Sequence, residues 1–198
     1  MSEILAINGS YRSGGVTDQV VATMTEALRD AGVSVETIML REYPIEFCLN
    51  CRHCTRQPGA APGRCVLDDA MGDLLGRIES SRGYILASPT NFGGVTALFK
   101  RFMERLIVYA YWPREMSAPR YRKAGAVKKK AVLVSSCAAP AILGRFSFHT
   151  RQELKAAART IGAVPVGTIF TGLVGGDPHP ELSRRVKARA GRLAAKLV

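Results

Sequence analysis

One segment combines glycine, hydroxyl and arginine residues in a pattern that suits the binding of a phosphate group. Residues 9–17 read Gly-Ser-Tyr-Arg-Ser-Gly-Gly-Val-Thr. Glycines let the backbone approach a ligand, and the hydroxyls of Ser10, Ser13 and Thr17 can donate to phosphate oxygens. Arg12 adds positive charge, and a helix N-terminus after the loop would attract an anion. The spacing is neither that of a Walker A loop nor that of a dinucleotide fingerprint. The pattern predicts a monophosphate site, with an ordinary capped strand-to-helix turn as the alternative.

A second segment gathers cysteines. Of the five cysteines in the chain, Cys48, Cys51 and Cys54 follow a Cys-x2-Cys-x2-Cys pattern, and Cys65 follows after ten more residues. Four thiolates in one loop can hold a [4Fe–4S] cluster. A zinc site with His53 as a substitute ligand and a group of free thiols are the alternatives. The spacing alone leaves all three open.

A third segment with chemical potential is a polar, glycine-rich turn. It comprises Pro89, Thr90, Asn91, Phe92 and Gly93 and follows an apolar run. Such a turn can lie against a flat heterocycle while its backbone groups reach the polar edge of the ring. An isolated aromatic residue, however, is more typical of ordinary packing.

The apolar pattern predicts the elements that position these segments. Strands are expected at residues 4–7, 33–40, 84–87, 131–134 and 164–170, and helices at 20–31, 68–78 (capped by Asp68), 95–110, 141–161 and from 181 onward. Five strands alternating with helices predict an α/β fold with a parallel, doubly wound sheet. Ligands bind such sheets at the carboxyl ends of the strands. Pro165 and Gly167 place the fifth strand at an edge.

Two stretches do not fit this alternation, the cysteine-rich loop near 41–67 and an inserted loop near 112–130. Long loops inside a compact domain are usually functional or disordered. The inserted loop interleaves aromatic residues with arginines, which suits a lid over a nucleotide or a subunit interface. We hypothesise that Arg120, Arg122 or Lys123 binds a nucleotide phosphate. An exposed loop with ordinary surface charge is the alternative. Residues 1–198 are expected to form a single domain.

Composition limits the function classes. The chain of 198 residues has a formal charge of +12 and no apolar run long enough to span a membrane. Its basic residues are scattered rather than gathered on one reading element, so we expect no nucleic-acid partner and no membrane partner. No signal peptide is visible at the N-terminus, which predicts a cytoplasmic protein.

Two of these segments resemble the NADPH-dependent FMN reductase and iron–sulfur flavoprotein branch of the flavodoxin-like superfamily. The family's first loop, Gly-Ser-x-Arg-x-x-Gly-x-Thr, is matched at Gly9, Ser10, Arg12, Gly15 and Thr17. Its third-strand loop is matched from Ser88 to Gly93. The similarity extends from residue 3 to about residue 108. It implies a flavodoxin-like doubly wound five-stranded parallel sheet in the order 2-1-3-4-5, with helices on both faces.

The resemblance also implies cofactors and site residues. Ser10, Arg12, Gly15, Val16 and Thr17 would hold the FMN phosphate; Pro89, Thr90, Asn91, Phe92 and Gly93 would line the isoalloxazine ring; and Ser135, Ser136 and Cys137 would close the third side. Iron–sulfur flavoproteins place a compact cysteine motif where Cys48, Cys51, Cys54 and Cys65 stand, although the last gap here is longer than usual.

The implied activity is that of an NAD(P)H oxidoreductase of the flavin or quinone type. Electrons would pass to a small-molecule or protein acceptor, and the chain would form a homodimer or homotetramer. The alternative is an iron–sulfur flavoprotein that acts as an electron-transfer protein.

Overall fold

A five-stranded parallel sheet forms the centre of the molecule in a computed structural model that describes residues 3–174 and 180–198. Its strands lie in the order β2-β1-β3-β8-β9. They comprise β1 (Ile4–Asn8), β2 (Val35–Met39), β3 (Gly83–Ala87), β8 (Lys129–Ser136) and β9 (Ala163–Thr171). Every neighbouring pair is parallel. The predicted strand order is therefore confirmed.

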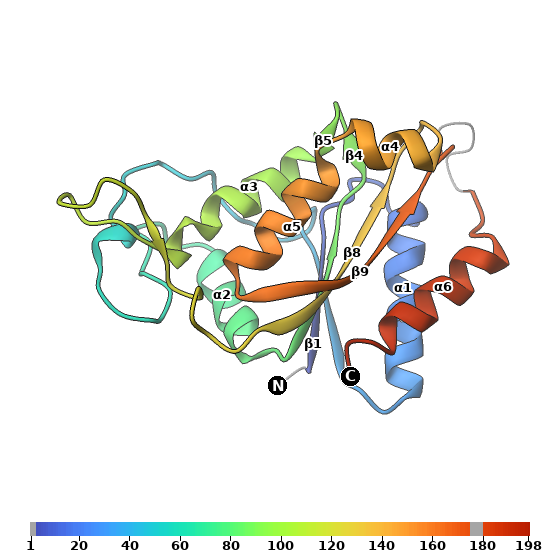
Figure 1. Ribbon diagram of the computed structural model, residues 1–198, viewed down its shortest axis with the longest axis horizontal. Coiled ribbons are helices and arrows are strands. Elements are labelled where there is room, and N and C mark those ends of the chain that lie inside the picture. The colour runs from blue at the N-terminus through green and yellow to red at the C-terminus, as the bar shows by residue number, and fades with distance from the viewer. Residues whose placement is uncertain (1–2, 175–179) are drawn as a thin grey trace.

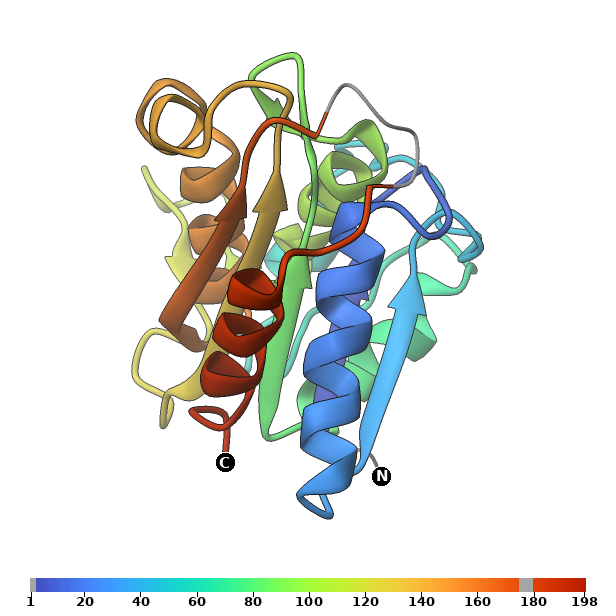
Figure 2. The same ribbon diagram turned by 90° about the vertical axis from the view of Figure 1, so that its right-hand side faces the viewer.

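Helices cover both faces of the sheet, as predicted (Figure 1). Helices α1 (Val16–Asp30) and α6 (Arg184–Ala194) lie side by side on one face, as Figure 2 shows. Helices α2 (Met71–Ser80), α3 (Ala97–Arg105) and α5 (Thr150–Thr160) cover the other. Each layer buries its own apolar cluster against the sheet. None of the described helices is long and apolar enough to cross a membrane.

Strand β9 lies at the sheet edge, as its proline and glycine predicted. Ala131 pairs with Pro165 and Val132 with Gly167, so Val166 is an extra residue that forms a bulge. Proline has no N–H to donate, and an edge strand beside a bulge tolerates this loss.

Two local predictions need correction. The helix expected at residues 141–161 is interrupted, giving α4 (Ala141–Ser147) and α5. The break occurs where the N–H of His149 donates to the carbonyl of Gly93 (2.7 Å), which holds the loop after β3. At the start of α2, the carboxylate that accepts the N–H of Met71 (3.0 Å) belongs to Asp69 rather than to Asp68.

The two long insertions contact each other at one end of the molecule (Figure 1, left). The first contains the short helix η1 (Cys54–Arg56). The second follows the short helix η2 (Leu106–Tyr109) and forms a small hairpin from β6 (Ala110–Tyr111) and β7 (Arg120–Tyr121). Residues 41–67 and 106–123 are called the cysteine lobe below.

Candidate functional site

A cavity of about 310 Å³, called the strand-end cavity below, lies at the carboxyl edge of the sheet. Of the thirteen residues predicted to hold a flavin, ten line it: Ser10, Arg12, Gly15, Val16, Thr17, Pro89, Thr90, Asn91, Ser136 and Cys137. The loops after β1, β3 and β8 therefore converge as the sequence predicted. Tyr11, Ala138, Val174 and Pro180 also line the cavity, and sequence reasoning missed them. Val174 and Pro180 follow the last strand and carry no local signal.

The start of α1 faces this cavity. Gly15 is the N-cap residue of the helix, and no side chain accepts a hydrogen bond at this cap. The first helical residues, Val16 and Thr17, both line the cavity. A helix N-terminus carries backbone N–H groups and a partial positive charge that favour an anion.

A buried network behind the loop fixes its shape. The carboxylate of Asp18 accepts from the side-chain amide of Asn8 (2.7 Å), from the N–H of Gly14 (3.1 Å) and from the guanidinium of Arg41 (3.0 Å). Arg41 also donates to the carbonyl of Ser10 (3.2 Å). Both ends of the loop are thereby tied to one carboxylate. Sequence reasoning missed Asp18 and Arg41 because their partners lie on different elements.

The loop after β3 forms a tight hairpin from β4 (Thr90–Asn91) and β5 (Gly94–Val95). Its turn residues Phe92 and Gly93 both have positive φ, 50° and 82°. This conformation is rare for a bulky residue. It leaves the Phe92 ring fully exposed, so neither Phe92 nor Gly93 lines the strand-end cavity. Thr90 reaches inward and shares a hydrogen bond with the hydroxyl of Thr150 (2.9 Å).

The end of β8 closes the third side. The hydroxyls of Ser136 and Thr17 lie 2.9 Å apart, so a residue predicted to close the third side meets a predicted phosphate ligand at the sheet edge. Ser135 is buried and does not line the cavity. Burial raises the pKa of the Cys137 thiol, whose S–H donates to the carbonyl of Ala139 (3.1 Å). The thiol therefore remains neutral at pH 7.

The four clustered cysteines line one small cavity, called the thiol cavity below, of about 20 Å³. They come from two ends of the same loop, with Cys48, Cys51 and Cys54 on one side and Cys65 on the other. Burial and the neighbouring thiols raise the pKa of Cys54. Within residues 3–174 and 180–198, no three His, Cys, Asp or Glu side chains are placed to hold a single metal ion. Zinc needs its ligands grouped around one ion, so this observation does not favour the zinc alternative. A [4Fe–4S] cluster does not need that arrangement, because its cysteines bind different irons.

The backbone between these cysteines adopts an uncommon conformation. Asn50 and Arg52 both have positive φ, 50° and 60°, although neither is glycine. Such residues cluster at ligand sites, where alternating backbone conformations turn N–H groups inward. Here the N–H of Asn50 donates to the sulfur of Cys48 (3.4 Å).

A buried ion pair supports the fourth cysteine. Arg105, only 1% exposed, donates to both carboxylate oxygens of Asp69 (2.5 and 3.0 Å), to the carbonyl of Glu46 (2.8 Å) and to the sulfur of Cys65 (3.6 Å). Burial opposes the charge on Asp69, but hydrogen bonds from Arg105 and from the N–H groups of Glu46 and Met71 hold its pKa below the ordinary value. The pair therefore stays charged at neutral pH.

A further arginine joins the two insertions. Arg122 donates to the backbone carbonyls of Val108 (3.0 Å), Gly59 (2.6 Å), Cys54 (3.1 Å) and Gln57 (2.7 Å). A Cβ at Gly63 would overlap the carbonyl oxygen of Cys54, so only glycine fits there. The structure places Arg122 in the cysteine lobe, and Lys123 pairs with Glu79 (2.5 Å). Neither these two residues nor Arg120 lines the strand-end cavity, so the binding of a nucleotide phosphate by one of them stays a prediction for a position outside it.

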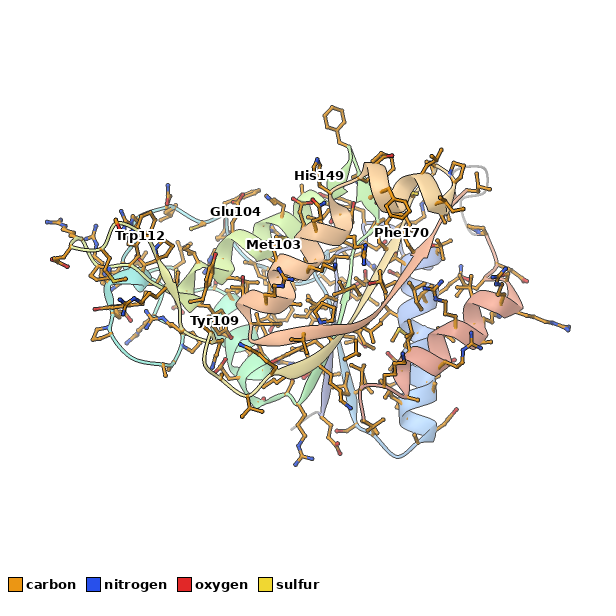
Figure 3. The ribbon with its side chains drawn as sticks, viewed as in Figure 1. Met103, Glu104, Tyr109, Trp112, His149 and Phe170 are labelled. Atoms are coloured by element: carbon orange, nitrogen blue, oxygen red, sulfur yellow. The ribbon has the colours of Figure 1, made fainter. Side chains whose placement is uncertain are left out.

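Side-chain positions show the separation of the two regions. Trp112 and Tyr109 lie at the cysteine-lobe end of the molecule, whereas Phe170 lies near the carboxyl end of β9 and His149 at the start of α5 (Figure 3).

Comparison with known proteins agrees with this geometry. A family model described as NADPH-dependent FMN reductase matches residues 2–172. The chain belongs to this family. The predicted resemblance is therefore confirmed.

Curated relatives of this member of the NADPH-dependent FMN reductase family include iron–sulfur flavoproteins. One from Methanocaldococcus jannaschii is 31% identical over 103 residues, which cover 52% of this chain and 51% of the relative. One from Archaeoglobus fulgidus is 32% identical over 109 residues, or 55% of this chain and 47% of the relative. The chain thus spans about half the length of the curated relatives it matches.

Solved structures share the fold over nearly the whole chain. An NAD(P)H:quinone oxidoreductase from Methanothermobacter marburgensis has a TM-score of 0.66 at 20% identity, covering 98% of this chain and 94% of that one. An FMN-dependent NADH-azoreductase from Bacillus anthracis, solved in complex with FMN, has a TM-score of 0.66 at 13% identity, covering 100% and 99%. These similarities confirm the flavodoxin-like architecture.

Proposed function

We propose that this chain is an FMN-dependent NAD(P)H oxidoreductase of the flavin or quinone type. The observation that carries the proposal is the convergence of three loops on the strand-end cavity, whose volume of about 310 Å³ lies within the range of small-molecule sites. Hydroxyl groups, Arg12 and the start of α1 line its phosphate side, and the loop after β3 lines the opposite side. The family match and this donor set point to the same cofactor.

Each group of residues has a defined role in this proposal. Ser10, Thr17 and Ser136 donate to the phosphate, and Arg12 balances its charge. The Asp18 network keeps the loop in place before the cofactor binds. Pro89, Thr90 and Asn91 present backbone and polar groups to the ring, with Cys137 and Ala138 opposite. Bound FMN supplies the hydride chemistry, because it accepts an electron pair and releases electrons singly or in pairs.

We also propose that Cys48, Cys51, Cys54 and Cys65 hold a [4Fe–4S] cluster. Four thiols line one cavity, beside a backbone turned as in anion-binding loops. The open space of about 20 Å³ is close to the size of one water, so seating a cluster requires the exposed residues 49–51 to move outward. Cys51 lies on the exposed side, where such movement meets no packed core. With a cluster, the chain is suited to act as an electron-transfer protein, which is the second candidate function.

The proposed partners follow from these two sites. NAD(P)H is the hydride donor, and a small molecule or protein is the acceptor. A cleft of about 560 Å³ along α2 shares Cys65 and Arg105 with the thiol cavity, so an acceptor bound there lies next to the cluster.

The proposed contact of a homodimer or homotetramer is a group of exposed apolar residues near the carboxyl edge of the sheet, Ile142, Phe146 and Phe92. The proposed location is the cytoplasm, where clustered thiols stay reduced.

Flavin uptake and reduction test the proposal. Apoprotein mixed with FMN is expected to develop the spectrum of a bound flavin, which NADPH or NADH then bleaches without oxygen. A protein that takes up no FMN contradicts the proposed cofactor. Bound FMN that neither nucleotide bleaches, but that a one-electron donor reduces, favours the electron-transfer function instead.

A further inference from the structure

Two arginines line the thiol cavity together with the four cysteines. They are Arg52, on the loop between Cys51 and Cys54, and Arg105, the last residue of α3. In both side chains the Nε atom is buried and has no hydrogen-bond partner among the described residues. A buried donor without an acceptor costs about 1–3 kcal/mol. Two such donors at one small cavity therefore require an explanation.

Both guanidinium groups are held rigidly beside the cavity. Arg105 is fixed through its Nη atoms by Asp69 and the carbonyl of Glu46. The guanidinium of Arg52 lies 3.9 Å from the centre of the Trp112 ring, and one of its Nη atoms donates to the Trp112 carbonyl (3.3 Å). Trp112 is itself fixed, because its backbone N–H donates to the carbonyl of Thr55 (2.6 Å). The inserted loop thus positions a charge at the cysteines.

Arg122 shows what a purely structural arginine in this lobe does. Its Nε and both Nη atoms donate to backbone carbonyls, and its Nε is not among the unpartnered groups. Arg52 and Arg105 differ because each keeps an N–H donor unpaired beside the cysteines. One of these contacts is already directed at sulfur, from Nη2 of Arg105 to Cys65 (3.6 Å).

We propose that Arg52 and Arg105 donate hydrogen bonds to the sulfur atoms of the [4Fe–4S] cluster and raise its reduction potential. This inference rests on the proposed cluster. Four thiolates around a cluster bring net negative charge into the lobe, and one-electron reduction adds another. Two fixed positive charges with free N–H donors stabilise the more negative state, since hydrogen bonds to cluster sulfurs tune its potential. Arg52 and Arg105 act on the cluster as positioning and tuning residues and do not ligate it.

The test is a redox titration of the anaerobically purified holoprotein, with iron content measured on the same samples. Arg52→Gln removes the positive charge and the guanidinium group, including its Nε–H donor, from a half-buried position. At a fixed potential near the midpoint, the ratio of reduced to oxidised cluster is expected to fall about tenfold, which corresponds to about 59 mV for one electron. Arg52→Lys keeps the charge but not the planar donor group, so we expect a smaller shift in the same direction.

Arg56→Gln is the matched control, because Arg56 is exposed in the same loop, carries the same charge and does not line the thiol cavity. Its expected shift is less than twofold. Equal shifts in Arg52→Gln and Arg56→Gln would show that surface charge alone changes the potential, which would overturn the inference. An unshifted potential in Arg52→Gln with full iron content would overturn it as well.

Arg105→Lys provides a second measurement. Lysine is chosen because its positive charge can retain the ion pair with Asp69. A fall in the reduced fraction with full iron supports the inference. Full iron with an unchanged reduced fraction counts against it. Wild-type protein that binds no iron after reconstitution overturns the proposed cluster itself, and this result is distinct because it appears in the iron analysis before any titration.

Discussion

The strand-end cavity and the cysteine lobe are built by different means. The cavity is formed where three strands of the sheet end, and one carboxylate, Asp18, ties its first loop together. The cysteine lobe has little regular structure, and arginine side chains that donate to backbone carbonyls and to Asp69 hold it in place. The first site follows from strand order, whereas the second depends on a few long side chains.

This difference implies that the two sites can be damaged separately. Residues that fix the cysteine lobe should alter its stability and metal content without changing flavin affinity. Residues that fix the loop after β1 should alter flavin affinity without changing the stability or metal content of the cysteine lobe. Each prediction below tests that independence, in order of decreasing expected effect.

Arg122→Ala should have the largest effect. It removes charge-assisted hydrogen bonds to four backbone carbonyls, with an expected loss of roughly 2–4 kcal/mol in the stability of the cysteine lobe. Limited proteolysis near residues 55–64 measures this opening. Arg120→Ala is the control, because Arg120 is exposed two residues away. Unchanged proteolysis in Arg122→Ala would contradict the role of Arg122 in holding the lobe. A loss of FMN affinity as large as the loss of lobe stability would refute the independence of the two sites.

Asp18→Asn should weaken FMN binding by about tenfold, which corresponds to 1.4 kcal/mol. The change removes the charge that accepts from Gly14 and Arg41 and so loosens the phosphate loop. Fluorescence titration with FMN measures the affinity, and Asp30→Asn, at the exposed end of the same helix, is the control. Susceptibility of residues 55–64 to protease should remain at the wild-type level; a rise there would mean that the two regions are coupled.

Acid should weaken the cysteine lobe through Asp69. The folded-state pKa of Asp69 lies below its unfolded value of about 3.9, so its stabilisation is present above that pH. It is lost as the pH falls through the lower folded-state pKa. Hydrogen exchange of the lobe, followed from pH 5 downward, should therefore show accelerated opening below about pH 4. Asp69→Asn should remove this part of the pH dependence, and an unchanged profile in the variant would contradict the assignment.

Phe92→Asn should have the smallest effect. Asparagine tolerates positive φ better than phenylalanine, so the free energy of unfolding should stay the same or rise by up to about 1 kcal/mol. FMN affinity should not change, because the Phe92 ring does not line the strand-end cavity. A loss of affinity greater than tenfold would instead support the stacking role that the sequence motif implied.

The family resemblance was enough to predict the strand order, and the sequence located most of the residues of the strand-end cavity. Apolar runs locate strands, and loops after parallel strands meet at one edge, so Ser10, Thr17 and Ser136 could be grouped without a structure. The orientation of Phe92 could not be foreseen, because a turn with two positive φ angles directs the ring outward. The roles of Arg105 and Arg122 were also hidden, since their partners lie tens of residues away in sequence.

The central claim is that the loop after β1 holds the phosphate of FMN at the start of α1. The most direct measurement compares the affinities of the apoprotein for FMN and for riboflavin, which lacks only the phosphate. Charge-assisted hydrogen bonds to the phosphate should make FMN bind at least about 100-fold more tightly, and Thr17→Val should reduce that ratio. Equal affinity for the two flavins, or a ratio unchanged in Thr17→Val, would contradict the assignment of the phosphate to this loop.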